Sequence, residues 1–182
     1  QASNPHGTLA GKGTWQQAGG TGRTQLSFKL DSGDVGSLLA RMGYPGTVRA
    51  GTALLEGKLA WNGAPTEIDY ASMHGDLNLQ AAKGQFLKLD PGAAGKLLSL
   101  ISLQNLPRRI SLDFKDVFSE GLAFDTIAGK LAVQKGVMRT DLLQIDSPSA
   151  RVLMRGEVDL ARETQRLNVT VQPELGDTVA VG

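Results

Sequence analysis

The 182-residue sequence lacks cysteine altogether and is poor in aromatic residues, which make up 5% of the chain. Without thiols, the chain cannot form disulfide bonds, cysteine metal sites or a thiol-based catalytic centre, and it suits an oxidising compartment. Its two histidines, His6 and His74, show no H-x-x-x-H spacing, so we expect no metal site and no cofactor. The scarcity of aromatics beside 23 glycines indicates many turns and thin strands rather than a helical bundle.

Long hydrophobic runs and a charge excess are also missing. The 19 basic residues oppose 18 acidic ones, which removes the positive surface expected of a nucleic-acid-binding protein. No run approaches the roughly 18 to 20 apolar residues needed to cross a bilayer. The length predicts one domain over residues 1–182. Because the chain starts at Gln1 without Met or a signal sequence, we interpret it as a mature protein or, preferably, as a piece excised from a longer one.

What the sequence does contain is strand after strand of alternating apolar and polar residues. This period of two is typical of an antiparallel sheet with one buried and one solvated face. The expected strands cover residues 8–16, 23–30, 47–61, 67–70, 75–81, 85–89, 109–115, 122–133, 137–145, 151–160 and 165–172. Asn62-Gly63 predicts a tight hairpin between two of them. The fold class is therefore mainly β, with a large antiparallel sheet.

Two short helices interrupt the predicted strands. Asp31 is the expected N-cap of the first, which should end near Gly43, and Asp90 is the expected N-cap of the second, which Pro107 would terminate. The pattern L-D-x-G-x-x-G-x-L-L occurs at both helix starts with an offset of 59 residues. We take this as an internal strand-helix-strands repeat, with halves at about 23–84 and 85–172.

The predicted sheet carries more apolar surface than two short helices can cover. A sandwich, a closed or partly closed barrel, and a curved sheet folded like a taco over an open apolar groove all remain possible from the pattern alone. Only the last, or a roomy barrel, leaves space for a guest molecule. A filled core is the ordinary expectation, since large exposed apolar patches are rare on single proteins.

Catalytic patterns are not found. Asp113 and Asp116 would point to opposite faces of a strand, which is poor geometry for a pair of catalytic acids. There is no G-x-S-x-G motif, and the run from Gly92 to Lys96 lacks the spacing and hydroxyl of a phosphate-binding loop. We therefore expect that this chain is not an enzyme.

Two features near the second helix have alternative interpretations. Arg108 and Arg109 could bind a phosphate headgroup or a partner surface, or could satisfy helix carbonyls and a surface salt bridge. The leucine-rich helix, with Leu97, Leu98 and Ile101, could be a lid on the core, or could contact a membrane or gate a groove.

Several motifs in the second half of the chain carry a resemblance to a known family. They are Leu106-Pro-Arg-Arg109 followed by Leu112-Asp-Phe114, Asp116-Val-Phe118, Phe124-Asp125 leading to Gly129, Lys135-Gly136-Val137, Ser147-Pro148-Ser-Ala-Arg151 and Gly156-Glu-Val-Asp-Leu160. With Leu59-Ala-Trp61-Asn-Gly63-Ala-Pro65 upstream, the chain resembles the C-terminal region of YhdP-type proteins, members of the AsmA-like group of Gram-negative envelope proteins.

The resemblance implies a long periplasmic protein, anchored in the inner membrane by one N-terminal helix. Its curved β-sheet would carry phospholipids along a hydrophobic groove toward the outer membrane, and this chain would be the terminal segment. The expected groove residues are Leu26, Phe28, Ile110, Leu112, Phe114, Val152, Met154, Leu167, Val169 and Val171. The alternative is a structural or docking module with a filled core that binds an outer-membrane or other envelope protein.

Overall fold

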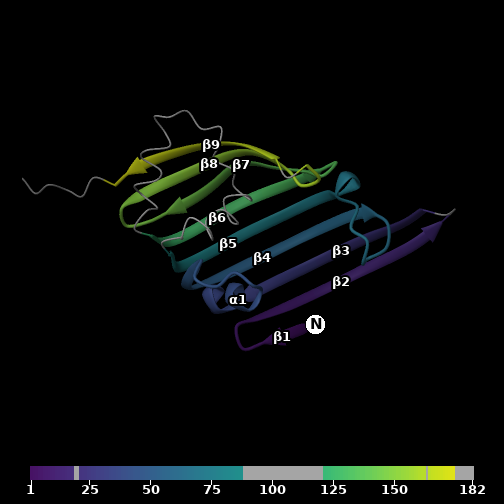
Figure 1. Ribbon diagram of the computed structural model, residues 1–182, viewed down its shortest axis with the longest axis horizontal. Helices are drawn as coiled ribbons and strands as arrows, with labels where there is room; N and C mark the ends of the chain where they lie inside the picture. The colour runs from purple at the N-terminus through teal and green to yellow at the C-terminus, as the bar shows by residue number, and fades with distance from the viewer. Residues whose placement is uncertain (19–20, 88–120, 163, 175–182) are drawn as a thin grey trace, which may run out of the picture.

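The computed structural model describes residues 1–18, 21–87, 121–162 and 164–174. Within these ranges the chain forms nine strands, one short α-helix and one turn of 3₁₀-helix (Figure 1). The strands are β1 (Ala2–Asn4), β2 (Gly7–Ala18), β3 (Thr21–Ser32), β4 (Val48–Asn62), β5 (His74–Phe86), β6 (Leu122–Gln134), β7 (Val137–Asp146), β8 (Ala150–Asp159) and β9 (Thr164–Pro173). The helices are α1 (Val35–Arg41) and η1 (Tyr70–Ser72).

The nine strands form a single antiparallel sheet in which each strand pairs with its neighbours in sequence. The order runs from β1 at one edge to β9 at the other, so the described sheet is open and is not closed into a barrel. Figure 1 shows that the sheet is curved rather than flat. The predicted fold class, a mainly β protein with a large curved antiparallel sheet, is confirmed.

The alternation of residue types explains why these segments form strands. In β3, Leu26, Phe28 and Leu30 are half-buried, whereas the intervening Ser27 and Lys29 are exposed. The expected strands 47–61, 122–133, 137–145 and 165–172 agree within one residue at each end with β4, β6, β7 and β9, and 8–16 and 23–30 agree within two residues with β2 and β3. The expected strand 151–160 corresponds to β8.

Two predictions about the connection between β4 and β5 are wrong. Residues 67–70 do not form a strand, and Asn62-Gly63 is not a tight hairpin, because residues 63–73 separate the two strands and include η1. The backbone N–H of Gly63 donates to the carbonyl of Gly22 at 2.8 Å, and the indole Nε1–H of Trp61 donates to the carbonyl of Ala64 at 3.1 Å. These contacts hold the chain over the end of the sheet instead of turning it back at once.

The first helix begins later than predicted. Asp34, not Asp31, is its N-cap, since the Asp34 side chain accepts a hydrogen bond from the backbone N–H of Ser37 at 3.0 Å. Asp31 is still part of β3, where it pairs with Leu54 of β4. The helix ends at Arg41, close to Gly43 as expected, and Gly43 has a φ of 94° that suits a chain reversal.

The segments expected as separate strands at 75–81 and 85–89 belong to one strand as far as Phe86. β5 runs through Lys83, which has a φ of 56° and lies opposite Gly51 of β4, with a φ of 86°. The register places Asp125 of β6 on the other side of Lys83. The register is unchanged across this line, but the alternation of buried residues in β6 shifts by one there, since Leu122 and Phe124 are buried before Asp125 and Ile127 is buried after it.

The predicted second helix, the strand 109–115 and the second copy of the L-D-x-G-x-x-G-x-L-L pattern lie outside the described residues. Buried apolar side chains of the described part form two clusters. The larger consists of Leu122, Phe124, Ile127, Ile145, Val152 and Val169, from β6 to β9. The smaller consists of Trp61, Met73 and Val133. Both clusters lie on the same face of the sheet, because strand partners in register share a face.

Candidate functional site

One row of apolar residues crosses eight strands of the sheet. Cross-strand partners point to the same face, so the register can be followed from strand to strand. From β2 to β9 the partners are Leu9, Leu30, Leu55, Leu79, Gly129, Leu143, Met154 and Val169. No polar side chain interrupts this row, and we call the face that carries it the apolar face.

Rows on either side extend the apolar face along the strands. Toward α1 the register joins Ser32, Ala53, Ala81, Ile127, Ile145, Val152 and Val171. Toward the opposite end it joins Leu26, Leu59, Gly75, Val133, Met138, Val158 and Gln165. The face is thus several rows deep, with one hydroxyl in the first of these rows and one amide in the second.

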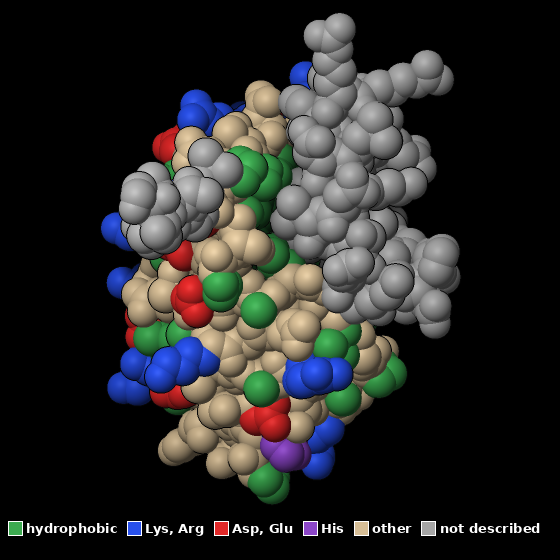
Figure 2. Space-filling model, turned by 90° about the vertical axis from the view of Figure 1, so that its left-hand side faces the viewer, with side chains coloured by type: hydrophobic (Ala, Val, Ile, Leu, Met, Phe, Trp, Pro, Cys, Tyr) green, Lys and Arg blue, Asp and Glu red, His purple; other side chains and the backbone are tan. Residues whose placement is uncertain are grey.

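The burial of the apolar face changes from one side of the sheet to the other. On β8 and β9, Val152 and Val169 are 0% and 3% exposed. In the middle of the sheet, Leu55 and Leu79 are half-buried, and Leu9 on β2 is 44% exposed. Figure 2 shows hydrophobic side chains gathered in the upper middle of this view, with Lys and Arg side chains mostly toward its left margin. The face is therefore packed at β6–β9 and more accessible at β2–β5.

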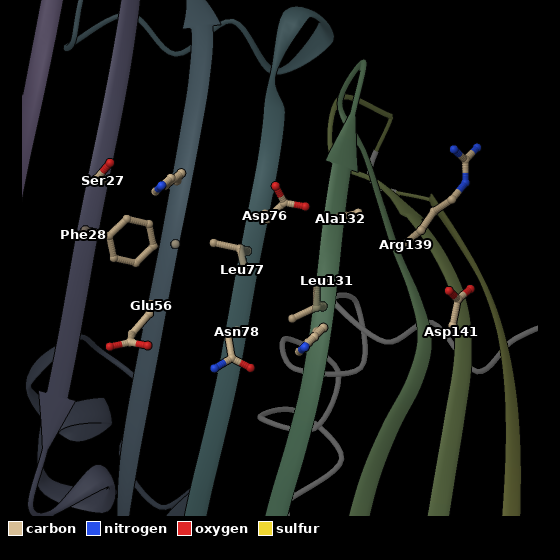
Figure 3. Close-up of a pocket in the computed structure, with 13 residues that line it drawn as sticks. Ser27, Phe28, Glu56, Asp76, Leu77, Asn78, Leu131, Ala132, Arg139 and Asp141 are labelled. Carbon is tan, nitrogen blue, oxygen red and sulfur yellow. The ribbon is translucent and has the colours of Figure 1, made fainter.

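Glycines on the apolar face let neighbouring side chains lie flat against the sheet. A Cβ built on Gly57 would overlap Leu77 and come within 3.1 Å of Phe28, and one built on Gly129 would lie 2.8 Å from Cδ1 of Leu143. Figure 3 shows Phe28 and Leu77 extending toward each other across β4. The apolar surface is therefore formed by large side chains that cover their glycine neighbours.

The structure brings the described groove residues together. The seven that lie in the described ranges share the apolar face by register: Leu26, Phe28, Val152, Met154, Leu167, Val169 and Val171. Val152 and Val169 belong to the packed cluster, whereas the other five are partly exposed. The remaining candidates lie outside the described residues: Leu97, Leu98, Ile101, Arg108, Arg109, Ile110, Leu112 and Phe114.

Sequence reasoning missed the centre of the apolar face. Leu55 and Leu79 lie in the middle of the long row, yet neither was among the expected groove residues. In β4 the adjacent Leu54 and Leu55 hide the alternation, because two neighbouring leucines point to opposite faces. Only the pairing of Leu55 with Leu30 and of Leu54 with Asp31 distinguishes them.

The opposite face, which we call the polar face, carries cross-strand ion pairs. Lys29 and Glu56 are 3.0 Å apart, and so are Arg139 and Glu157. Exposed pairs of this kind stabilise a protein by at most about 1 kcal/mol each. They chiefly keep this side of the sheet solvated.

A shallow hollow of about 830 Å³ extends across β3 to β7 (Figure 3). Its charged lining residues all come from the polar-face positions or the β7 irregularity: Glu56, Lys58, Asp76, Lys130, Arg139 and Asp141. Leu55 and Leu79 of the long row do not line it. The hollow instead lies along an apolar row formed by Phe28, Gly57, Leu77 and Leu131. Charged neighbours of this row flank the hollow, with three cations balancing three anions.

The described residues hold no cluster suited to metal chemistry. In that part of the chain no group of three or more His, Asp or Glu side chains could hold a metal ion. None of its helices has the length and apolar character needed to cross a bilayer. The apolar face is thus the most extensive candidate site that these ranges present.

Comparison with known proteins identifies the family. The family model described as YhdP protein matches residues 1–182. The chain belongs to the YhdP family. A curated relative, the intermembrane phospholipid transporter YhdP of Escherichia coli (strain K12), is 33% identical over 173 residues, which are 95% of this chain and 14% of the relative. No solved structure matches the chain.

The comparison confirms the expected YhdP-type membership. The E. coli YhdP protein is named as a transporter and not as an enzyme, which agrees with the absence of catalytic patterns in the sequence. The chain spans only 14% of that relative's length. Within the YhdP family, this segment contributes an open sheet with an apolar face crossing eight strands.

Proposed function

We propose that the apolar face of this sheet contacts the acyl chains of phospholipids that pass between the inner and outer membranes. In this proposal the chain is the terminal segment of a periplasmic bridge, which is anchored in the inner membrane and supports the permeability barrier of the outer membrane. The single observation that carries the proposal is the uninterrupted apolar row from Leu9 to Val169. The printed name of the E. coli relative supports phospholipid as the cargo.

The physical argument concerns the cost of exposing acyl chains to water. Exposure costs about 0.8 kcal/mol for each CH₂ group, so an unshielded phospholipid cannot leave a bilayer easily. An acyl chain that moves from the bilayer to the apolar face exchanges one water-free environment for another. Its passage along the face therefore needs little net free energy. The open edge of the sheet would let the headgroup remain in water, and the polar face would keep the whole segment soluble.

The accessible part of the face favours a guest molecule. Leu30, Leu55 and Leu79 are adjacent in the row and only half-buried. A contiguous apolar surface of this kind commonly marks an interaction site. On the packed side, at β6–β9, the same row is already covered. Within the long row, we therefore propose that lipid contact is made at β2–β5.

A photo-crosslinking amino acid at two neighbouring positions tests the proposal. The 182-residue chain is expressed in the periplasm of a Gram-negative host with the crosslinker at Leu55 or, as a matched control, at Leu54. Both side chains are half-buried, but they point to opposite faces. We expect phospholipid adducts by mass spectrometry at position 55 and not at position 54. Equal adducts at the two positions, or none at position 55, would contradict the proposal.

A docking module for an outer-membrane or other envelope protein is the second candidate. The packed cluster around Val152, whose side chain is fully buried, favours it because this filled core leaves no room for lipid against Val152 and Val169. Native mass spectrometry of the gently purified chain separates the two candidates. Co-purified phospholipid supports the conduit, whereas a lipid-free chain that also fails to take up a fluorescent phospholipid supports the docking module.

A further inference from the structure

Gln165 places an amide at the end of an apolar row. It is the second residue of β9 and pairs in register with Val158 of β8. The row continues through Met138 to Val133, which is 4% exposed and belongs to the smaller core cluster. Because side chains alternate along a strand, Gln165 points to the apolar face and its neighbour Arg166 to the polar face.

The amide of Gln165 is buried and has no hydrogen-bond partner. Both its Nε2 and its Oε1 atoms are shielded from solvent, and among the described side chains they are the only buried nitrogen or oxygen atoms left unpaired. A buried polar group without a partner destabilises a protein, and native structures pair nearly all of them. An apolar side chain at this position would remove the cost. The unpaired amide therefore calls for an explanation in terms of a partner molecule.

The position of the amide indicates which part of a phospholipid would reach it. The row of Gln165 lies at the end of the apolar face away from α1, immediately after the connection between β8 and β9. A phospholipid whose acyl chains lie along the apolar rows has its glycerol esters at the border between those rows and water. Ester carbonyl oxygens accept hydrogen bonds, and the Nε2 group of glutamine donates them.

We propose that Gln165 binds phospholipid by donating a hydrogen bond from Nε2 to an ester carbonyl oxygen of the glycerol backbone. This inference rests on the proposed lipid-contacting function of the apolar face and adds a specific polar contact to it. It assigns to Gln165 the role of favouring glycerol diesters over molecules that offer hydrocarbon chains alone.

The test compares two lipids and two proteins. Diester phosphatidylethanolamine and its diether analogue, which lacks the carbonyl groups, are titrated against the 182-residue chain and its Gln165→Leu variant by displacement of a fluorescent lipid. We expect the unmodified chain to bind the diester about fivefold more tightly than the diether, the effect of one neutral hydrogen bond. Gln165→Leu should bind both lipids equally, at the weaker affinity.

Thermal unfolding of the lipid-free proteins distinguishes this role from a structural one. Gln165→Leu should unfold at a higher temperature, since it removes an unpaired buried amide, even though it binds the diester less tightly. If Gln165→Leu does not fold, Gln165→Met, which has an unbranched side chain of similar length, is used in its place. Asn168→Leu, on the polar face of the same strand, should leave the preference for the diester unchanged.

The outcomes separate this inference from the function on which it rests. If the unmodified chain and Gln165→Leu bind diester and diether lipids alike, the proposed ester contact is wrong while lipid binding stands. If the unmodified chain binds neither lipid, the proposed function of this segment fails together with the contact. Loss of the diester preference in Asn168→Leu as well would show that the preference does not depend on Gln165.

Discussion

The ring of Phe124 lies directly over Gly84, its cross-strand partner on β5. A Cβ atom built on Gly84 would overlap the Cζ atom of the ring. The ring is held there by Phe86, whose centroid is 5.1 Å away at an interplanar angle of 45°. Gly84 does not have a positive φ, so the contact with the ring, and not the backbone conformation, requires glycine at this position.

We expect Gly84→Ala to lower the free energy of unfolding by about 1 to 3 kcal/mol, since the added methyl group overpacks the cluster around Phe124. Urea unfolding followed by circular dichroism measures the change. Gly33→Ala is the matched control, because a Cβ built on Gly33 meets no atom within 4 Å. It should alter stability by no more than about 0.5 kcal/mol. Equal effects of the two substitutions would mean that Phe124 does not occupy this place.

Lys83 lies on β5 where the alternation of buried residues shifts, and its backbone conformation can be tested by substitution. Its φ of 56° is uncommon for a residue with a side chain, and glycine relieves this strain. Lys83→Gly should therefore maintain stability or raise it by about 0.5 to 1 kcal/mol. Lys130→Gly, in the neighbouring strand at a position without positive φ, should lower stability by a similar amount. Destabilisation by both substitutions in urea unfolding would contradict the strain inferred from the φ of Lys83.

Much of the fold could be predicted from the sequence because the alternation is strong in single strands. Leu26 and Phe28, like Val152 and Met154, lie two residues apart in strands whose intervening residues are mostly polar or charged, so their shared face follows from the pattern. The pairing of one strand with another could not be predicted in this way. That Met154 lies beside Leu143 and Val169 depends on the register, which no single strand encodes.

The errors arose where two local signals competed. Asp31 and Asp34 are both suitable N-caps, and only the pairing of Asp31 with Leu54 keeps it in β3. Asn62-Gly63 has the composition of a tight turn, but the Gly63 N–H bonds to Gly22, which is distant in sequence. Gln165 gave no signal at all, because a lone glutamine in a strand is ordinary until its burial is known.

Asp146 should make stability dependent on pH. The pKa of its carboxyl group is lowered chiefly by the hydrogen bond from Arg151, at 2.7 Å, with a further contribution from Gln144. A carboxyl group with a lowered pKa contributes stability above its unfolded-state value, near 3.8, and this contribution is lost as the pH falls through the folded-state pKa. We therefore expect the urea concentration at the unfolding midpoint to decrease when the pH is lowered below about 4. Asp146→Asn should reduce this decrease.

The control for Asp146 is Asp125→Asn, which removes an exposed carboxylate on β6. This variant should retain the decline in the urea midpoint at low pH. If Asp146→Asn declines as steeply as the unmodified chain, the bond from Arg151 does not stabilise the folded state measurably.

A charge in the middle of the long apolar row should abolish lipid retention. In Leu55→Glu the carboxylate would lie between Leu30 and Leu79, where a bound acyl chain could not solvate it. Leu54→Glu adds the same charge to the same strand, but beside Asp31 and Gln80 on the polar face. Native mass spectrometry of the two purified variants measures the phospholipid that each retains, and we expect loss in Leu55→Glu alone.

Circular dichroism must show that both variants fold, because Leu54 and Leu55 are equally half-buried and either substitution removes some packing. This equal burial gives the comparison its value, since a general loss of stability would affect the two variants alike. A folded Leu55→Glu chain that still carries phospholipid would show that the lipid does not lie against this row. Loss in both variants would instead indicate that retention depends on the stability of the sheet and not on its apolar face.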